Sequence, residues 1–168
     1  AYSPQLEYDE AFVGKATKSD ERQELKKGRG SQRQAIVATM AESTILEDLQ
    51  TGEKDKSCRY FKMKKIDDLK AKTAEKLIRD FIDKKAVLQI DESTTFTNLE
   101  DCVDVHVHEI SSTSEGKFNL KWAHIAISNL KGYLRTYHMV SERKLQNYLD
   151  EFCYKIKGDI SAKNYLTG

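Results

Sequence analysis

The segment Ala86-Val87-Leu88-Gln89-Ile90-Asp91 is a nearly continuous apolar run that ends at an acidic residue. Such a run is typical of a β-strand buried on both faces, as in a sheet covered by helices. A carboxylate at the end of a buried strand is costly unless a positive group, such as a metal ion, compensates its charge. Asp91 is therefore a candidate site residue, although an aspartate that caps the following turn explains the position equally well.

Three earlier segments also have the pattern of strands. Segment 6–13, Leu-Glu-Tyr-Asp-Glu-Ala-Phe-Val, begins with alternating apolar and acidic residues and stops at Gly14. Segment 35–40 is a short apolar run, and segment 58–63 mixes aromatic and basic residues. Asp9 lies within the first of these strands and is a second candidate for a buried acid.

Apolar periodicity predicts three helices, over residues 73–82, 120–134 and 141–154. Thr73 and Ser141 are the predicted N-caps of the first and third helices, and Glu75 suits the dipole of the first turn. The predicted apolar faces consist of Leu77, Ile78, Phe81 and Ile82, then Ile127, Leu130 and Leu134, then Leu145, Tyr148, Leu149 and Phe152. The order of elements predicts an α/β domain in which helices flank a central mixed β-sheet.

Composition favours a single globular domain. The chain has 168 residues, of which 33% are charged and 39% hydrophobic. It contains no apolar run as long as a membrane span and no secretory signal, so we expect a cytoplasmic protein without a membrane partner. Cys58, Cys102 and Cys153 are far apart and form no C-x-x-C pair, which argues against a zinc site or a disulfide framework.

The formal net charge of +1 is nearly neutral, but basic residues cluster in segment 26–33. Arg29 and Arg33 in this glycine-bearing segment would grip phosphate groups, or they are simply solvated, with neither reading favoured. His106 and His108 alternate in a second short segment, where we favour a strand with outward polar side chains over a metal site.

Three stretches together carry a family resemblance. They are Leu6-Glu7-Tyr8-Asp9-Glu10-Ala11-Phe12-Val13-Gly14, then Leu88-Gln89-Ile90-Asp91-Glu92-Ser93-Thr94-Thr95-Phe96, then Trp122-Ala123-His124-Ile125-Ala126-Ile127-Ser128-Asn129-Leu130-Lys131 with Thr136-Tyr137-His138 and segment 145–152. Over about residues 6–156 the chain resembles the DDE-type transposases of insertion sequences, specifically the ISXO-like group.

The resemblance implies an RNase H-like fold and a metal-dependent transposase that cleaves and transfers DNA strands. It implies that Asp9, Asp91 and His124 are the catalytic residues and hold two divalent ions, Mg²⁺ or Mn²⁺. Histidine stands at the third position, which is usually Glu or Asn in this family, and imidazole is the softer ligand, so Mn²⁺ would compete well. Lys131, two helical turns beyond His124, would contact DNA, and Asn129 is a further DNA-binding candidate.

The same resemblance implies DNA as the partner, both transposon ends and target, and self-association in the active complex at the nucleoid of a bacterium. Residues 6–156 would form the catalytic domain, and residues 157–168, which depart from the family pattern, a divergent or foreign tail. Two other functions remain open: a catalytically inactive DNA-binding or assembly fragment of a transposase, and a different RNase H-like nuclease that acts on RNA–DNA hybrids.

Overall fold

A computed structural model describes residues 5–14, 34–92, 99–137 and 140–166, with side chains as far as Ile156. Within these residues, five strands form one mixed sheet in the order β3-β2-β1-β4-β5. The strands are β1 (Gln5–Gly14), β2 (Gln34–Glu47), β3 (Lys54–Ile66), β4 (Val87–Asp91) and β5 (Val105–Glu109). β1 pairs antiparallel with β2 and parallel with β4. This confirms the predicted mixed sheet, in which the strand of Asp9 is central and the strand ending at Asp91 is its neighbour.

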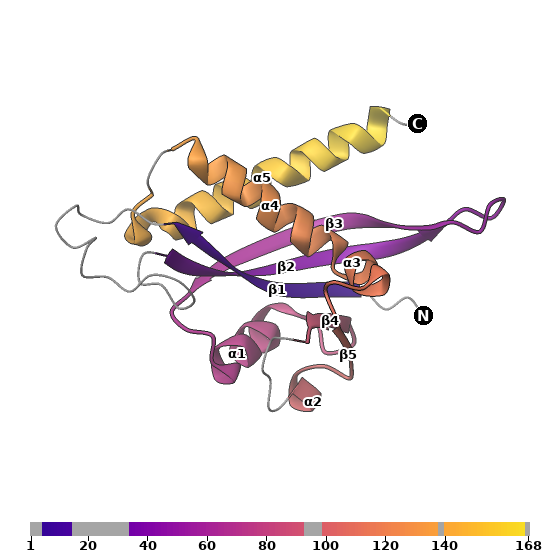
Figure 1. The fold of residues 1–168 in the computed structure, drawn as a ribbon, viewed down its shortest axis with the longest axis horizontal. Coiled ribbons are helices and arrows are strands. Elements are labelled where there is room, and N and C mark those ends of the chain that lie inside the picture. Colours follow the sequence, from indigo (N-terminus) through magenta and orange to yellow (C-terminus); the bar gives the residue numbers. More distant parts are fainter. Residues whose placement is uncertain (1–4, 15–33, 93–98, 138–139, 167–168) are drawn as a thin grey trace.

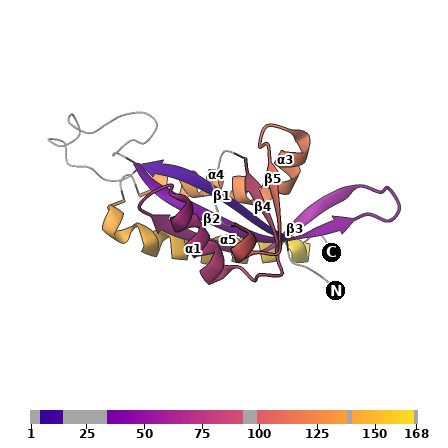
Figure 2. The same cartoon turned by 90° about the horizontal axis from the view of Figure 1, so that it is seen from below.

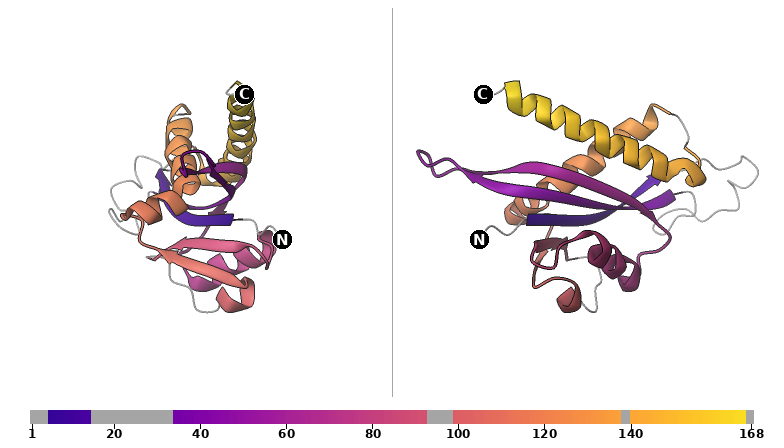
Figure 3. Two further views of the ribbon diagram at one scale, coloured as in Figure 1. Left: turned by 90° about the vertical axis from the view of Figure 1, so that its right-hand side faces the viewer. Right: turned by 180° about the vertical axis from the view of Figure 1, so that it is seen from behind.

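Helices cover both faces of this sheet (Figures 1 and 3). The first face carries α1 (Ala71–Phe81) and the short α2 (Leu99–Cys102), and the opposite face carries α4 (Lys121–Arg135) and α5 (Glu142–Leu166). A short helix, α3 (Ser114–Asn119), leads directly into α4. Each face has its own buried hydrophobic cluster. No helix in the described part of the chain is long and apolar enough to cross a membrane.

The two-residue alternation of a strand decides which side chains reach which face. In β1, Tyr8 belongs to the cluster beneath α1, whereas Val13 belongs to the cluster beneath α4 and α5. Asp9 lies four residues before Val13 and therefore faces α4 and α5. In β4, Leu88 and Ile90 pack with Tyr8, so Asp91 also faces the side of α4.

β2 and β3 are longer than predicted. Segments 35–40 and 58–63 form the parts of these strands within the body of the sheet, but both strands continue into a hairpin that projects beyond it (Figures 1 and 2). The hairpin turns at Asp48, whose Oδ1 accepts hydrogen bonds from the backbone N–H of Gln50 (2.8 Å) and Thr51 (3.3 Å), and Gly52 has a φ of 73°. Its outer residues have little apolar periodicity because no helix covers them.

The predicted helices 120–134 and 141–154 are confirmed as α4 and α5, and the residues of their predicted apolar faces are buried except for Tyr148, which is half-buried. The backbone helix of α5 extends further, through the predicted tail to Leu166. β5 is the strand that was favoured around His106 and His108, whose rings make an edge contact with centroids 5.5 Å apart. The short helices α2 and α3 were not predicted.

Three details of the predicted helix 73–82 are wrong. The helix begins at Ala71 with Lys70 in the N-cap position, so Glu75 lies beyond its first turn, which contains no acidic residue. Thr73 is not the N-cap and instead donates its hydroxyl to Asp68 Oδ1 at 2.6 Å. Phe81 is 41% exposed rather than buried. The buried residues of α1 are Ala74, Glu75 and Ile78, and the ammonium group of Lys62 lies over the exposed ring of Phe81, 3.9 Å from its centroid, in a cation–π contact.

Candidate functional site

The two candidate acids lie on neighbouring parallel strands at the same level. The register pairs Glu7 with Gln89 and Tyr8 with Ile90. Asp9 and Asp91 are the next residues along the two strands, which are separated by about 4.8 Å in such a sheet. Both side chains face α4, and both residues are only partly exposed. The fold thus places two carboxylates from distant parts of the sequence side by side, at the end of β4.

His124 lies in the first turn of α4, next to these acids. Its Nε2 lies 3.3 Å from Oδ2 of Asp9. The hydrogen bond with Asp9 raises the pKa of His124, burial opposes this rise, and the negative charge of Asp91 adds to it. The structure therefore brings together all three side chains for which the sequence predicted metal ligation.

The donor types of this trio fit a divalent metal ion. Carboxylate oxygens suit Mg²⁺ and Mn²⁺, and a neutral imidazole nitrogen suits Mn²⁺ in particular. In the conformation described, however, His124 contacts Asp9 directly, and none of the residues with described positions form a group of three His, Cys, Asp or Glu side chains arranged around one ion. An ion would have to replace the direct contact between His124 and Asp9.

A buried polar cluster lies next to the acids on the same face of the sheet. Glu7 and Lys56 are 0% and 2% exposed, and Oε2 of Glu7 is 3.1 Å from Nζ of Lys56. The same ammonium donates to Oε1 of Gln89 (3.0 Å) and to the carbonyl of Asn119 (2.7 Å). Burial raises the pKa of Glu7 and lowers that of Lys56, although their mutual attraction opposes both shifts. Two N–H groups of the ammonium thus donate hydrogen bonds, and its contact with Oε2 of Glu7 is an ion pair.

Glu7 also caps the helix that carries His124. Its Oε1 accepts hydrogen bonds from the backbone N–H groups of Trp122 (2.8 Å) and Ala123 (3.1 Å). The N-cap residue of α4 is Leu120, which has no side-chain acceptor. A carboxylate on β1 thus satisfies two N–H groups that a helix start leaves free, and its negative charge suits the helix dipole.

The prediction from sequence missed this cluster and one further acid. Glu109 ends β5, pairs in register with Asp91, is buried, and accepts a 2.6 Å hydrogen bond from Asn119. The alternation of β1 would have identified Glu7, because it lies two residues before Asp9 on the same face. No local pattern distinguishes Lys56 from the exposed basic residues around it.

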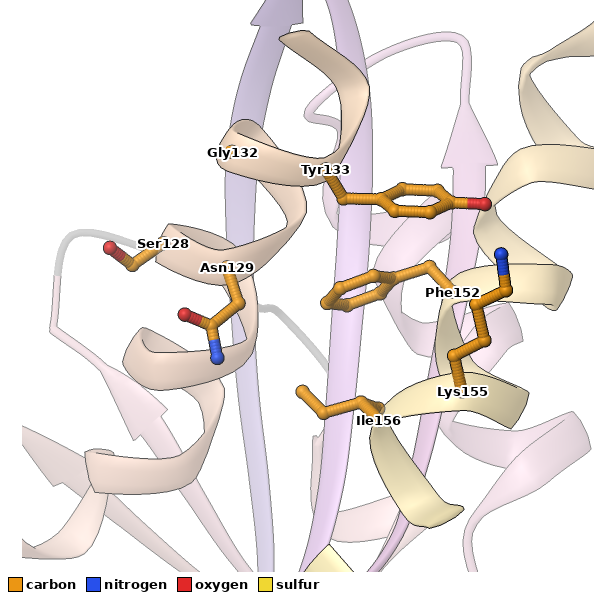
Figure 4. Close-up of a pocket in the computed structure, with 7 residues that line it drawn as sticks. All are labelled: Ser128, Asn129, Gly132, Tyr133, Phe152, Lys155 and Ile156. Atoms are coloured by element: carbon orange, nitrogen blue, oxygen red, sulfur yellow. The ribbon is translucent and has the colours of Figure 1, made fainter. Parts of the chain in front are cut away.

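The predicted DNA-binding residues occupy different places. Lys131 is exposed and lies seven residues after His124, on the same side of α4. Asn129 instead lines a pocket between α4 and α5, beside the rings of Tyr133 and Phe152 (Figure 4). It lies five residues after His124 and therefore on a different side of α4. Arg29 and Arg33 lie outside the described residues. Glu92, which follows Asp91, is exposed.

Comparison with known protein families agrees with the fold described above. The family model of the ISXO2-like transposase domain matches residues 3–157. No curated protein and no solved structure gives a match. The mixed five-stranded sheet flanked by helices is consistent with the RNase H-like fold expected of such a domain. Because the match spans nearly all of the sequence, the chain belongs to the family of ISXO2-like transposase domains.

Proposed function

We propose that this domain catalyses divalent-metal-dependent cleavage of DNA strands and their transfer to a target, with Asp9, Asp91 and His124 as the metal ligands. The observation that supports the proposal is the contact of His124 with Asp9, on the strand next to the one that ends at Asp91 and on the same face of the sheet. We expect the domain to act on transposon ends and target DNA as part of a self-associated complex at the bacterial nucleoid.

Each residue would have a distinct role. Asp9 contacts His124 and lies on the strand beside that of Asp91, so it would serve as a ligand of both ions. Asp91 and His124 would each hold one side of the pair, with His124 donating through Nε2 in its neutral form. Two divalent ions, when bound, would activate the attacking water or 3′-hydroxyl and stabilise the leaving oxygen. Lys131 would place a positive charge near a backbone phosphate at the border of the site.

The proposal can be tested by nicking of supercoiled plasmid and by joining of pre-cut duplex ends, in Mg²⁺ and in Mn²⁺. Asp91→Ala and His124→Ala should each lower both activities by more than about 100-fold, since each removes a metal ligand. His124→Glu should keep part of the activity and shift the preference from Mn²⁺ toward Mg²⁺. His106→Ala on β5 is the matched control and should behave as the parent.

Three outcomes would contradict parts of the proposal. If His124→Ala nicks as well as the parent while Asp91→Ala does not, the third ligand lies elsewhere, and Glu92 is the next candidate. A parent protein that binds DNA but neither nicks nor joins it would favour the inactive DNA-binding fragment. Faster cleavage of RNA–DNA hybrids than of duplex DNA would favour a different RNase H-like nuclease.

A further inference from the structure

The first turn of α4 is attached to the sheet by a set of contacts that converge on Glu7 and Lys56. Trp122 donates its backbone N–H to Glu7 and its indole Nε1–H to the carbonyl of Lys56 at 2.8 Å. Ala123 donates its backbone N–H to Glu7, and Lys121 forms an ion pair with Asp55. Three consecutive residues are thus fixed to β1 and β3 immediately before His124.

Lys56 extends the same attachment to the residues that precede α4. Its ammonium donates to the carbonyl of Asn119, the last residue of α3, while it pairs with Glu7 and Gln89. Asn119 in turn donates its side-chain amide to Glu109, the residue paired in register with Asp91. One ammonium therefore connects β1, β4 and the turn into α4.

We propose that Glu7 is a positioning residue, which seats the first turn of α4 and thereby fixes the imidazole of His124 against Asp9, while Lys56 balances the buried charge of its carboxylate. The inference rests on the proposed metal site only for its consequence on metal affinity. The placement of the helix is a property of the metal-free protein and can be measured in it.

Stability alone does not explain a fully buried ion pair at this place. Taking both charges out of water is costly, and well-packed apolar residues of similar size often serve a fold as well or better. What apolar residues lack is an acceptor for the N–H groups of Trp122 and Ala123, which are within hydrogen-bond distance of a single Glu7 oxygen. The acceptor on Glu7 defines where the helix starts, and Lys56 holds that carboxylate in place.

Two double variants separate the acceptor from the charges. Glu7→Gln with Lys56→Met removes both charges but keeps a carbonyl oxygen for the two backbone N–H groups. Glu7→Leu with Lys56→Met removes the charges and the acceptor together. Hydrogen exchange at the amides of Trp122 and Ala123 reports whether the first turn of α4 stays in place. The Mn²⁺ affinity of the whole chain reports the effect on the proposed metal site.

The Leu-containing double variant should remain folded, exchange these two amides at least about 10-fold faster and bind Mn²⁺ about 10-fold more weakly, as is typical when the support of a metal ligand is lost. The Gln-containing double variant should stay within about 3-fold of the parent in both measurements, because its acceptor remains. Glu75→Gln is the control, since Glu75 is a buried carboxylate on α1, on the other face of the sheet, and should leave both measurements unchanged.

Parent-like exchange and Mn²⁺ affinity in a folded Leu-containing variant would overturn the proposal, as would equal losses in both double variants. If the Leu-containing variant does not fold, Trp122→Phe removes the indole N–H that also holds this turn, together with part of the ring, and should weaken Mn²⁺ binding measurably. An unchanged affinity would show that the attachment of the first turn does not govern the metal site, which would again overturn the proposal. If the parent binds no Mn²⁺, the proposed function fails, and the amide exchange by itself decides whether Glu7 seats the helix.

Discussion

At the scale of single residues, the contact between His124 and Asp9 links structure to chemistry. A protonated imidazole is stabilised by the carboxylate 3.3 Å away, whereas a metal ligand has to be neutral. In the absence of metal, Asp9 therefore favours the form of His124 that cannot bind metal. Metal ions and protons should compete for this pair of side chains, so that metal affinity falls as the pH drops through the raised pKa of His124.

The first prediction concerns this pair in the metal-free protein. Asp9→Asn should lower the pKa of His124, because the hydrogen bond with Asp9 is the largest cause of its rise. The pKa is higher in the folded protein than in the unfolded chain. The contact therefore stabilises the fold below the ordinary pKa of histidine, and this contribution is lost as the pH rises through the folded pKa. NMR titration of His124 checks the shift, and urea unfolding at pH 5.5 and pH 8.5 should show a larger loss for Asp9→Asn at the lower pH. An unchanged pKa in Asp9→Asn would contradict the assignment.

At the scale of elements, the sequence was informative where one face of an element is apolar. β1, β4, α4 and α5 could be predicted because each packs on the sheet or within it, and burial imposes its periodicity. The outer hairpin, α2 and α3 could not, because they are short or uncovered and their residues follow no such period. The same limit applies to the site. Asp9 lies within a recognisable strand, and Asp91 ends another. The burial of Lys56, in contrast, depends on partners that are distant in the sequence, such as Asn119.

A second prediction concerns how α5 is held on β3, which is an edge strand of the sheet. Gln146 accepts a hydrogen bond from the backbone N–H of Lys65 (2.9 Å) and donates one to the carbonyl of Met63 (3.0 Å), as a paired strand would. Gln146→Leu should lower the free energy of unfolding by about 1–3 kcal/mol, because both backbone groups lose their partner. Asn147→Leu, at an exposed position on the same helix, should change it by less than about 0.5 kcal/mol. Equal effects in urea unfolding would contradict a specific role for Gln146.

At the scale of the whole molecule, the two faces of the sheet carry different kinds of side chain. Apolar side chains, among them Tyr8 and Ile90, fill the face beneath α1. The face beneath α4 holds Asp9, Asp91, the buried ion pair and, further along, an apolar cluster that continues to α5. DNA that reaches the acids would therefore pass over the exposed side of α4 near His124, and not along α1. Lys131 lies on that side of α4.

The last prediction tests this path through its electrostatics. Lys131→Gln should weaken duplex binding at low salt, and it should reduce the slope of log K against log salt concentration by about 0.9, the value for one lost phosphate contact. Lys72→Gln is the matched control, because Lys72 is also an exposed lysine on a helix but lies on α1, across the sheet. Its slope should equal that of the parent. Fluorescence anisotropy in EDTA at several salt concentrations measures binding without cleavage. Equal slopes for Lys131→Gln and the parent would show that Lys131 is simply solvated, and equal reductions in both variants would show that the DNA is held by net charge rather than along α4.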